Sequence, residues 1–409
     1  MSLSADAGKV ASKVKSRLAR RQLSKRLNAS QLPLSPGAYE VVVYFGDPAS
    51  YLYQLRPWLP VLRELAEQVG VMVIFRSADT ALRAMDDPAF DLPVAYAGAH
   101  RDIDPIIAEQ NLKVVFYVNH HKSNFAMLWQ PSVLHIYLGH GESDKAAISA
   151  SNQLKAYDFT FVAGQAAIDR VKRRLINFDA EKRLIRVGRP QLAYEAVDQS
   201  PPSDKPFTVL YAPSWEGDRP FNNYGSVRSH GQPMVDALLR DGRFRVIFRP
   251  HPLTGKIDRG YAAASDQISS SLAKAGAGEP GAGHFTDTTK DFGWQVLAAD
   301  YCVADVSAVA LDWLASDKPL VVATPSHQDA VVEPGSVIAR LPMIPAKQSA
   351  DIVTRLMSAA QASSARDLAA AREHCFGDTT PGVANLLFIT ATQELMQLRD
   401  RQIESLPPS

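Results

Sequence analysis

The chain has 409 residues, of which 46% are hydrophobic and 21% charged, a composition typical of a globular protein long enough for two full cores. Cys302 and Cys375 are its two cysteines, which excludes a disulfide framework or a cysteine-rich zinc site. No run of about 18 apolar residues predicts a membrane span, and the first residues lack the apolar core of a signal peptide. We therefore expect a protein of the reducing cytoplasm.

The net charge of +1 conceals a basic N-terminal arm. Residues 1–27 hold eight cations and one anion, so the arm carries +7 and the remainder 1 − 7 = −6. On a helix, Val10, Val14 and Leu18 would form one narrow apolar stripe. Two interpretations follow: residues 9–27 lie peripherally on an anionic membrane at the inner face of the cell, or they form a disordered, solvated tail. Nucleic acid is not an expected partner, because the body is acidic and has no aromatic-basic platform.

From residue 36 onward, short apolar strands alternate with helical stretches, which is typical of parallel α/β sheets. A polar linker at residues 200–206 interrupts the pattern, which then restarts. The Gly/Ala/Ser-rich stretch Ser269–Gly283 is predicted to be a mobile loop. The expected elements of the first half are strands at Tyr39–Gly46, Val71–Arg76, Lys113–Val118, Val133–Leu138, Phe159–Ala163 and Leu184–Val187, with a helix at Trp58–Gln68. Those of the second half are strands at Phe207–Tyr211, Phe244–Phe248, His284–Thr286, Tyr301–Ala304 and Leu320–Ala323.

These elements predict an α/β protein of two Rossmann-like, doubly wound domains facing a cleft, preceded by a basic helical arm. The expected boundaries are 1–35 for the arm, 36–195 for the N-terminal domain, 206–385 for the C-terminal domain, and 386–409 for a helix that crosses back onto the first domain.

Ligands of open parallel sheets bind beyond the carboxyl ends of the strands, so the loops there are the candidate site. One such loop holds Gly139-His140-Gly141, where flanking glycines leave an imidazole uncovered as a candidate general base; the alternative is a plain turn residue. The loop Arg249-Pro250-His251-Pro252 is stiffened by two prolines and, with Lys256, offers cations for phosphate oxygens. A third loop carries Ser214 before Trp215, and we take Trp215 as a packing residue.

The stretch 300–325 reads as a strand, a polar turn, a short helix and a second strand. Ser307 occupies the expected N-cap, so its hydroxyl and the free amides behind it would face an anion at the positive end of the helix. Asp305 and Asp312 bracket this turn. The alternative is an ordinary strand–helix–strand connection.

Other site chemistries find little support in the sequence. His120 and His121 are adjacent on an extended segment, so they point to opposite faces, and no cysteine or carboxylate cluster accompanies them as metal ligands. The chain also has no phosphate-binding P-loop, no Gly-x-Ser-x-Gly elbow and no dinucleotide glycine fingerprint near the first strand. No metal site is predicted.

Four segments, taken in their order along the chain, resemble the CDP-glycerol glycerophosphotransferase family of teichoic acid synthesis. They are Gly139-His140-Gly141 with Lys145, Tyr211-Ala212-Pro213-Ser214-Trp215, Arg249-Pro250-His251-Pro252, and Asp305-Val306-Ser307 with Asp312 and Lys318-Pro319. The resemblance covers about 200 residues. It implies a GT-B fold with the nucleotide held mainly by the second domain. It also implies transfer of an alditol phosphate, glycerol phosphate above all, from a CDP-alditol donor to a hydroxyl, with release of CMP.

Carried over residue by residue, the resemblance makes His140 and His251 catalytic. It places Gly141 and Lys145 on the acceptor side. The chain departs from the family's pattern at Glu142-Ser143-Asp144, at Glu216, which replaces an arginine, and at Ala308, which replaces a second serine. The residues matched to donor and phosphate binding are Arg249, Ser307, Asp305, Asp312, Ser214 and Lys256.

The expected acceptor is a polyol phosphate of a teichoic-acid-like or capsule polymer, or its lipid-linked primer. No cofactor is expected beyond the CDP-alditol substrate, and metal dependence stays open. One alternative is a GT-B glycosyltransferase or epimerase that uses a UDP-sugar. Another is a non-catalytic nucleotide-sugar-binding protein.

Overall fold

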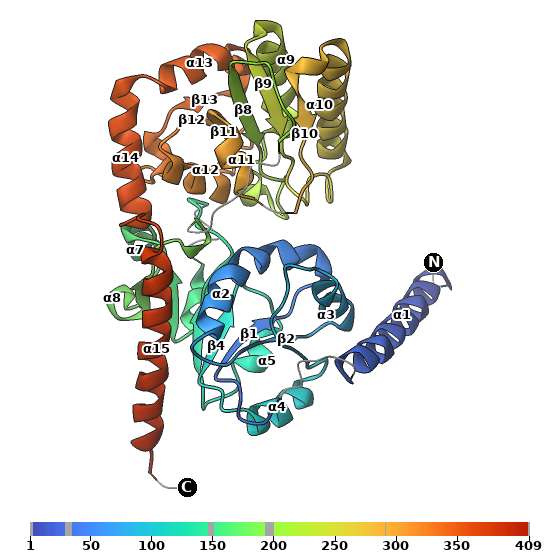
Figure 1. The fold of residues 1–409 in the computed structure, drawn as a ribbon, viewed down its shortest axis with the longest axis vertical. Helices are drawn as coiled ribbons and strands as arrows, with labels where there is room; N and C mark the ends of the chain where they lie inside the picture. Colours follow the sequence, from blue (N-terminus) through green and yellow to red (C-terminus); the bar gives the residue numbers. More distant parts are fainter. Residues whose placement is uncertain (1–2, 29–34, 146–150, 193–199, 291, 408–409) are drawn as a thin grey trace.

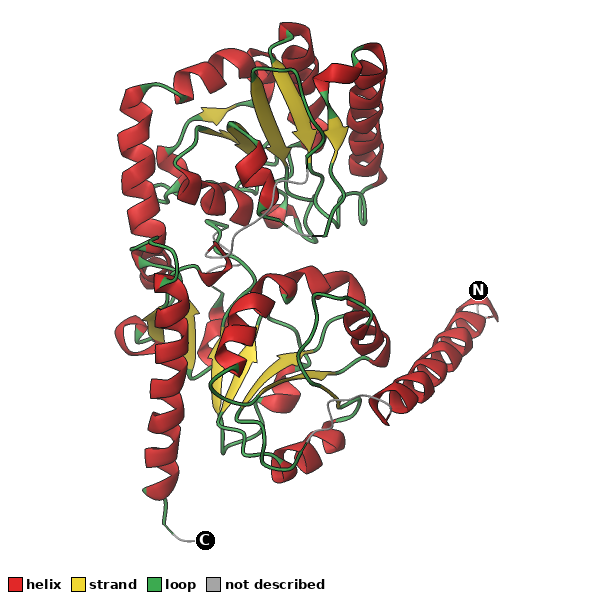
Figure 2. Cartoon of the chain, in the orientation of Figure 1, coloured by secondary structure: helices red, strands yellow, loops and turns green. Residues whose placement is uncertain are grey.

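The computed structural model describes residues 3–28, 35–145, 151–192, 200–290 and 292–407, which form two parallel β-sheets with helices on their faces (Figures 1 and 2). The seven-stranded first sheet has the order β3-β2-β1-β4-β5-β6-β7, and the six-stranded second sheet has the order β10-β9-β8-β11-β12-β13. The first sheet contains β1 (Val41–Phe45), β2 (Val71–Phe75), β3 (Val94–Tyr96), β4 (Val114–Tyr117), β5 (Leu134–Tyr137), β6 (Phe159–Val162) and β7 (Leu184–Arg186). The second contains β8 (Phe207–Ala212), β9 (Phe244–Phe248), β10 (Phe285–Thr286), β11 (Tyr301–Ala304), β12 (Leu320–Ala323) and β13 (Met343–Ile344).

The α-helices fall into two groups that cover the faces of the two sheets, together with a helix at each end of the chain. Around the first sheet lie α2 (Leu59–Ala66), α3 (Ala78–Met85), α4 (Ile103–Glu109), α5 (Asn124–Met127), α7 (Gln165–Arg174) and α8 (Ala180–Arg183). Around the second lie α9 (Gln232–Asp241), α10 (Arg259–Gly278), α11 (Trp294–Ala298), α12 (Ala308–Trp313), α13 (Ile352–Ala359) and α14 (Ala362–Phe376). The terminal helices are α1 (Leu3–Asn28) and α15 (Val383–Glu404).

The strands are apolar throughout because helices cover both faces of each sheet. Successive residues of β1 alternate between two cores: Val41, Val43 and Phe45 pack in one, while Val42 and Tyr44 pack in the other. The second sheet is built in the same way. In such a parallel sheet the carboxyl ends of all the strands lie at the same edge, and a ligand-binding site can form there.

The predicted two-sheet α/β architecture is confirmed, and each predicted strand is present to within a few residues. The edge strands β3 and β13 were not predicted, because two or three residues are too short to show a period. The expectation of a loop at Ser269–Gly283 is wrong, since α10 continues to Gly278. Asp258 caps that helix, and Ile268 and Leu272 are fully buried, so tertiary packing overrides a composition rich in glycine and serine.

The basic arm is the helix α1, and its N-terminal half projects from the body (Figure 1). Its far end is anchored: Leu23 is buried in the first core, and Arg26 forms an ion pair with Asp86 at the end of α3. Val14 and Leu18 are 50% and 63% exposed. Within the described ranges, no helix is long and apolar enough to span a membrane.

The C-terminal helices run past both sheets (Figure 1). α14 packs on α7 of the first domain, and α15 then packs on β4 and β5. Phe388 of α15 is fully buried against the rings of Trp58, Phe116 and Phe161. The last helix therefore completes the core of the first domain.

Candidate active site

The carboxyl ends of the two sheets meet, and the loops after their strands contact each other. Lys145, beyond β5, donates from Nζ to Ser214 Oγ beyond β8 at 2.7 Å. Arg189, beyond β7, donates from Nε and Nη2 to the two carboxylate oxygens of Asp312 in α12, at 2.9 and 3.0 Å. These contacts bring the predicted residues of the first domain and of the second into one site.

His140 lies at the centre of the first-domain edge. Gly139 before it has φ = 67°, which a side chain would strain, and its carbonyl accepts from Trp58 Nε1 at 2.8 Å. The ring lies close to the backbone of Val118, and Nδ1 is buried without a hydrogen-bond partner among the described residues. Nδ1 is therefore the ring nitrogen that is open to a ligand.

The surroundings of His140 keep it neutral. Burial, followed by the nearby cations Arg189 and Lys145, lowers its pKa from 6.5 to about 4. His120 packs face to face on Tyr137, with ring centroids 4.0 Å apart. Burial and the proximity of His140 lower the pKa of His120 to about 4 as well.

His251 approaches from the second domain, on the loop after β9. Its ring stacks on Trp215 with centroids 6.1 Å apart, and Tyr53 meets it edge-on at 5.6 Å. Tyr53 also meets His140 edge-on, at 6.3 Å, so this tyrosine lies between the two imidazoles. Nδ1 of His251 accepts the Leu253 amide at 3.1 Å, which leaves the proton on Nε2.

Charge accumulates around these histidines. Burial, with Lys145, His140 and Arg249 nearby, lowers the pKa of His251 to about 3. Burial lowers the pKa of Lys145 to about 8 despite Asp305 nearby, and Lys145 also lies 5.3 Å from the ring centroid of Tyr224. Lys145 and Arg189 of the first domain and Arg249 of the second therefore gather around the two imidazoles, an arrangement suited to an anion.

Asp305 and Ser307 are both buried at the start of α12. Asp305 Oδ2 accepts the amides of Ser214 and Ser226 at 2.6 and 3.0 Å, and burial raises its pKa to about 6. Ser307 caps α12, with Oγ accepting the Ala310 amide at 3.3 Å. Asp305 thus orders the loop after β8, and the predicted cap is present at Ser307.

Gly141 faces α12 across the domain boundary. A Cβ on Gly141 would lie 2.8 Å from the Cβ of Ala308 and 3.5 Å from Arg189 Nη2. A bulkier residue at position 141 or 308 would therefore separate the two loops. This contact uses Ala308 of α12.

Arg249 and Lys256 lie on the loop after β9. Arg249 forms an ion pair with Asp287 and also donates to Thr289 Oγ1 at 3.2 Å. Lys256 Nζ lies 4.9 Å from the ring centroid of Tyr51 in the first domain. Glu216 holds this loop through the amides of Gly255, Ile257 and Asp258, at 2.9, 2.9 and 3.1 Å. Glu216 therefore fixes the conformation of the loop that carries Arg249 and Lys256, the candidate phosphate-binding residues.

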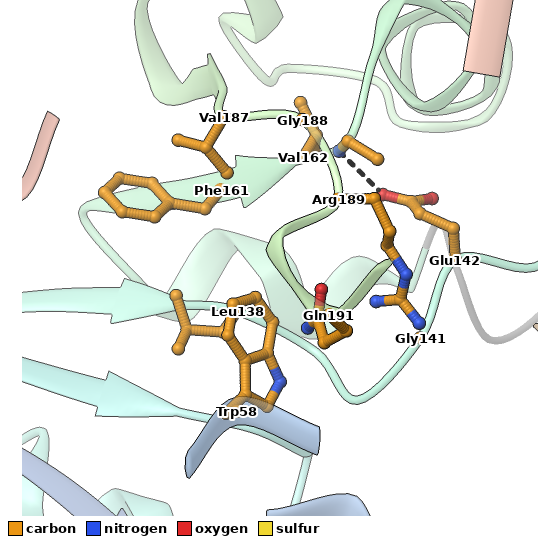
Figure 3. Close-up of a pocket in the computed structure, with 11 residues that line it drawn as sticks. Trp58, Leu138, Gly141, Glu142, Phe161, Val162, Val187, Gly188, Arg189 and Gln191 are labelled. Atoms are coloured by element: carbon orange, nitrogen blue, oxygen red, sulfur yellow. Dashed lines mark hydrogen bonds between the residues drawn. The ribbon is translucent and has the colours of Figure 1, made fainter. Parts of the chain in front are cut away.

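Two pockets adjoin these loops. Figure 3 shows the smaller, with about 10 Å³ of room, where Arg189 and Glu142 lie near Gly141 and Trp58. That volume holds about one water molecule. The larger is open, about 560 Å³, and lies beyond the second sheet. Its lining residues are Asn223, Arg228, Ser229, Asp258, Tyr261, Ser326 and His327.

Sequence reasoning missed Arg189 and Tyr53. Arg189 follows a strand and a glycine, but its partner Asp312 is distant in sequence, so spacing carries no signal. Tyr53 lies in a short 3₁₀ segment, Ala49–Gln54, with no recognisable pattern. In the described part of the chain, no group of three or more His, Cys, Asp or Glu residues is arranged to hold a metal ion.

Two facing parallel α/β domains, with a last helix that returns to the first, define the GT-B fold. The wall teichoic acid polymerase TagF, in a variant soaked with CDPG, shares this fold, with a TM-score of 0.57, 14% identity, and coverage of 98% of this chain and 99% of that one. A glycosyltransferase from Rickettsia africae matches with a TM-score of 0.52 and 14% identity over 88% of this chain and 99% of that one. A putative UDP-N-acetylglucosamine 2-epimerase from Listeria monocytogenes matches with a TM-score of 0.55 and 14% identity over 88% and 98%. No protein-family model matches the sequence, and a search of curated proteins finds no match.

Proposed function

We propose that this protein is a transferase that moves an alditol phosphate, glycerol phosphate first, from a CDP-activated donor to an acceptor hydroxyl and releases CMP. The observation that carries the proposal is the buried, unpartnered Nδ1 of His140, which lies near the cations Arg189 and Lys145 and beside the Tyr53 ring that also meets His251 of the other domain. The proposed acceptor is a teichoic-acid-like or capsule polymer or its lipid-linked primer.

In the proposed reaction, the acceptor oxygen attacks the phosphorus that bears the alditol. The new O–P bond forms as the bond to the CMP oxygen breaks, and the acceptor proton passes to His140 Nδ1. An imidazole with a pKa of about 4 is a weak base, but a bound diphosphate would offset Lys145 and Arg189 and raise that pKa toward the operating pH. Binding of the donor would thus raise the basicity of His140, which the transfer of the alditol phosphate requires.

The leaving group is CMP, whose phosphate gains charge as the bond breaks. His251 carries its proton on Nε2 and is therefore the candidate donor to that charge. Arg249, Lys256 and the capped start of α12 at Ser307 supply further positive potential. Asp312 holds Arg189 in place.

Measuring CMP release from CDP-glycerol, CDP-ribitol and UDP-sugars, with and without acceptors, tests the proposal. We expect release from a CDP-alditol that depends on the acceptor. UDP release from a UDP-sugar, or its epimerisation, would favour the second candidate function, which the shared fold of the Rickettsia and Listeria proteins supports. Binding of nucleotide without any turnover would indicate a non-catalytic protein.

A further inference from the structure

A polar cluster at the same edge of the first sheet has no part in the steps above. Asp47 follows β1, Arg76 follows β2, and His121, Lys122 and Ser123 follow β4. Because β1 lies between β2 and β4, these five residues, here called the edge cluster, share one end of the sheet. All except the exposed Lys122 are buried or half-buried.

The imidazole of His121 in the edge cluster is held by a local turn. Ser123 donates its backbone amide to His121 Nδ1 at 3.2 Å, and its Oγ lies 2.6 Å from the same nitrogen. An acceptor nitrogen keeps its electron pair, so the ring proton is on Nε2. Nε2 lies 3.8 Å from Asp47 Oδ1, which is beyond hydrogen-bonding distance, so this donor is free to bind a ligand oxygen.

Arg76 supplies a second unused donor. Its Nη1 is buried and has no hydrogen-bond partner among the described residues. The guanidinium is close enough to Tyr44 to oppose the rise in that hydroxyl's pKa caused by burial, and Tyr44 donates to the Ser123 carbonyl at 3.2 Å. Arg76 and the His121–Ser123 turn therefore both lie near the Tyr44 side chain.

Gly46 allows this assembly to close. A Cβ at that position would lie 1.7 Å from Ser123 Oγ and 2.9 Å from His121 Nδ1, so a side chain there would displace both groups. Arg76 and Lys122 outnumber the one carboxylate, Asp47, and His121 adds a further donor. The edge cluster therefore favours an anion with several oxygens, for which a phosphate group is the best match.

The edge cluster also adjoins the proposed base. Asp47 is near enough to Tyr53 to contribute to the raised pKa of that hydroxyl, and the Tyr53 ring packs against His140. A molecule held by its phosphate at Arg76 and His121 would extend along this edge toward His140 Nδ1.

We propose that the edge cluster binds a phosphate group of the acceptor and thereby presents the acceptor hydroxyl to His140. The inference rests on the proposed function and narrows it: the preferred acceptor already carries a phosphate monoester or diester, as the end of a polyol phosphate chain does. Neutral glycerol would then be a poor acceptor.

Binding is tested first, on the full chain and without donor, by calorimetry with sn-glycerol 3-phosphate, inorganic phosphate and glycerol. We expect sn-glycerol 3-phosphate to bind, Arg76→Gln to weaken it at least about tenfold, and Arg76→Lys to restore part of the affinity. Arg101→Gln, at a 91% exposed side chain, is the matched control and should change nothing. No binding by the parent protein, or equal binding by Arg76→Gln, would overturn the proposal, and inorganic phosphate binding as tightly as the ester would overturn the acceptor assignment.

Turnover is tested second, by CMP release with phosphorylated and neutral acceptors. Arg76→Gln should raise KM for the phosphorylated acceptor at least about tenfold and leave the CMP dissociation constant unchanged. Ser123→Ala, which keeps the guanidinium, serves as a second variant if Arg76→Gln unfolds. If no donor yields CMP while Arg76-dependent binding of the ester persists, the proposed function fails and the anion site stands.

Discussion

At the scale of single residues, proton positions decide what each imidazole can do. Nδ1 of His140 has no partner among the described residues and is the proposed proton acceptor, whereas Nδ1 of His251 is occupied by the Leu253 amide, so the other nitrogen of His251 donates. The two rings, separated by Tyr53, therefore have complementary proton roles at neutral pH without either being charged.

The first prediction concerns His140. His140→Ala should lower kcat by at least about 10²-fold and leave the dissociation constant of CMP nearly unchanged, because the ring acts on the acceptor. The rate of CMP release gives kcat, and calorimetry gives the dissociation constant of CMP. His100→Ala, at an exposed site, is the control. A parallel loss of CMP affinity would place His140 in the donor site instead.

The second prediction concerns Lys145, whose pKa burial lowers to about 8. The ammonium is charged below that pH and neutral above it, so CMP affinity should fall as pH rises through about 8. Lys145→Arg should remove this alkaline decline, because a guanidinium stays charged. Calorimetry between pH 6.5 and about 9.5 provides the test, and a decline that persists in the arginine variant would implicate another group.

At the scale of elements, one ion pair joins the end of the first sheet to α12. The side chains of Arg189 and Asp312 are only 8% and 10% exposed, so removing either partner leaves an uncompensated buried charge. Arg189→Met and Asp312→Leu should each destabilise the fold by about 3–5 kcal/mol, while the double variant should be closer to the parent. Chemical unfolding of all four proteins measures this coupling.

The same four proteins separate a structural from a ligand-binding role of Asp312. If the pair only holds the domains together, the double variant should recover both stability and CMP affinity. If Asp312 also contacts the donor, the double variant should regain the stability of the parent protein but not its affinity for CMP. Single variants as stable as the parent would contradict the buried pair.

How far the sequence predicts these elements depends on the range of the interactions. Runs such as Val41–Phe45 encode a strand locally, and the serine at Ser307 encodes a helix start, so both could be read directly. Arg189 acquires its role only when α12 is brought against it, and α10 forms because Ile268 meets the second sheet. Non-local packing of this kind leaves no period in the sequence.

At the scale of the whole molecule, positive charge is concentrated on α1, whose C-terminal part is anchored to the body through Leu23 and Arg26. Because Leu23 is buried, deleting residues 1–27 would also open a gap in the first core. Replacing Lys15, Arg17, Arg20 and Arg21 by glutamate avoids this and should abolish binding to anionic vesicles at low salt, since each cation contributes about 1 kcal/mol.

Vesicle sedimentation measures that binding, with neutral vesicles as the lipid control. Replacing four exposed residues of similar charge elsewhere, Arg63, Arg83, Arg101 and Lys182, provides the protein control. Equal sedimentation of the α1 variant and the parent would discard the membrane role of the arm.

The packing of α15 on the first domain affects when that domain can fold during synthesis. Phe388 fills a core whose other aromatic residues, Trp58, Phe116 and Phe161, leave the ribosome much earlier. At about 5–20 residues per second, the gap of over 200 residues between Phe161 and Phe388 corresponds to about 10–45 s. During that interval the nascent first domain lacks the helix that covers β4 and β5, and its core can close only after Phe388 has emerged.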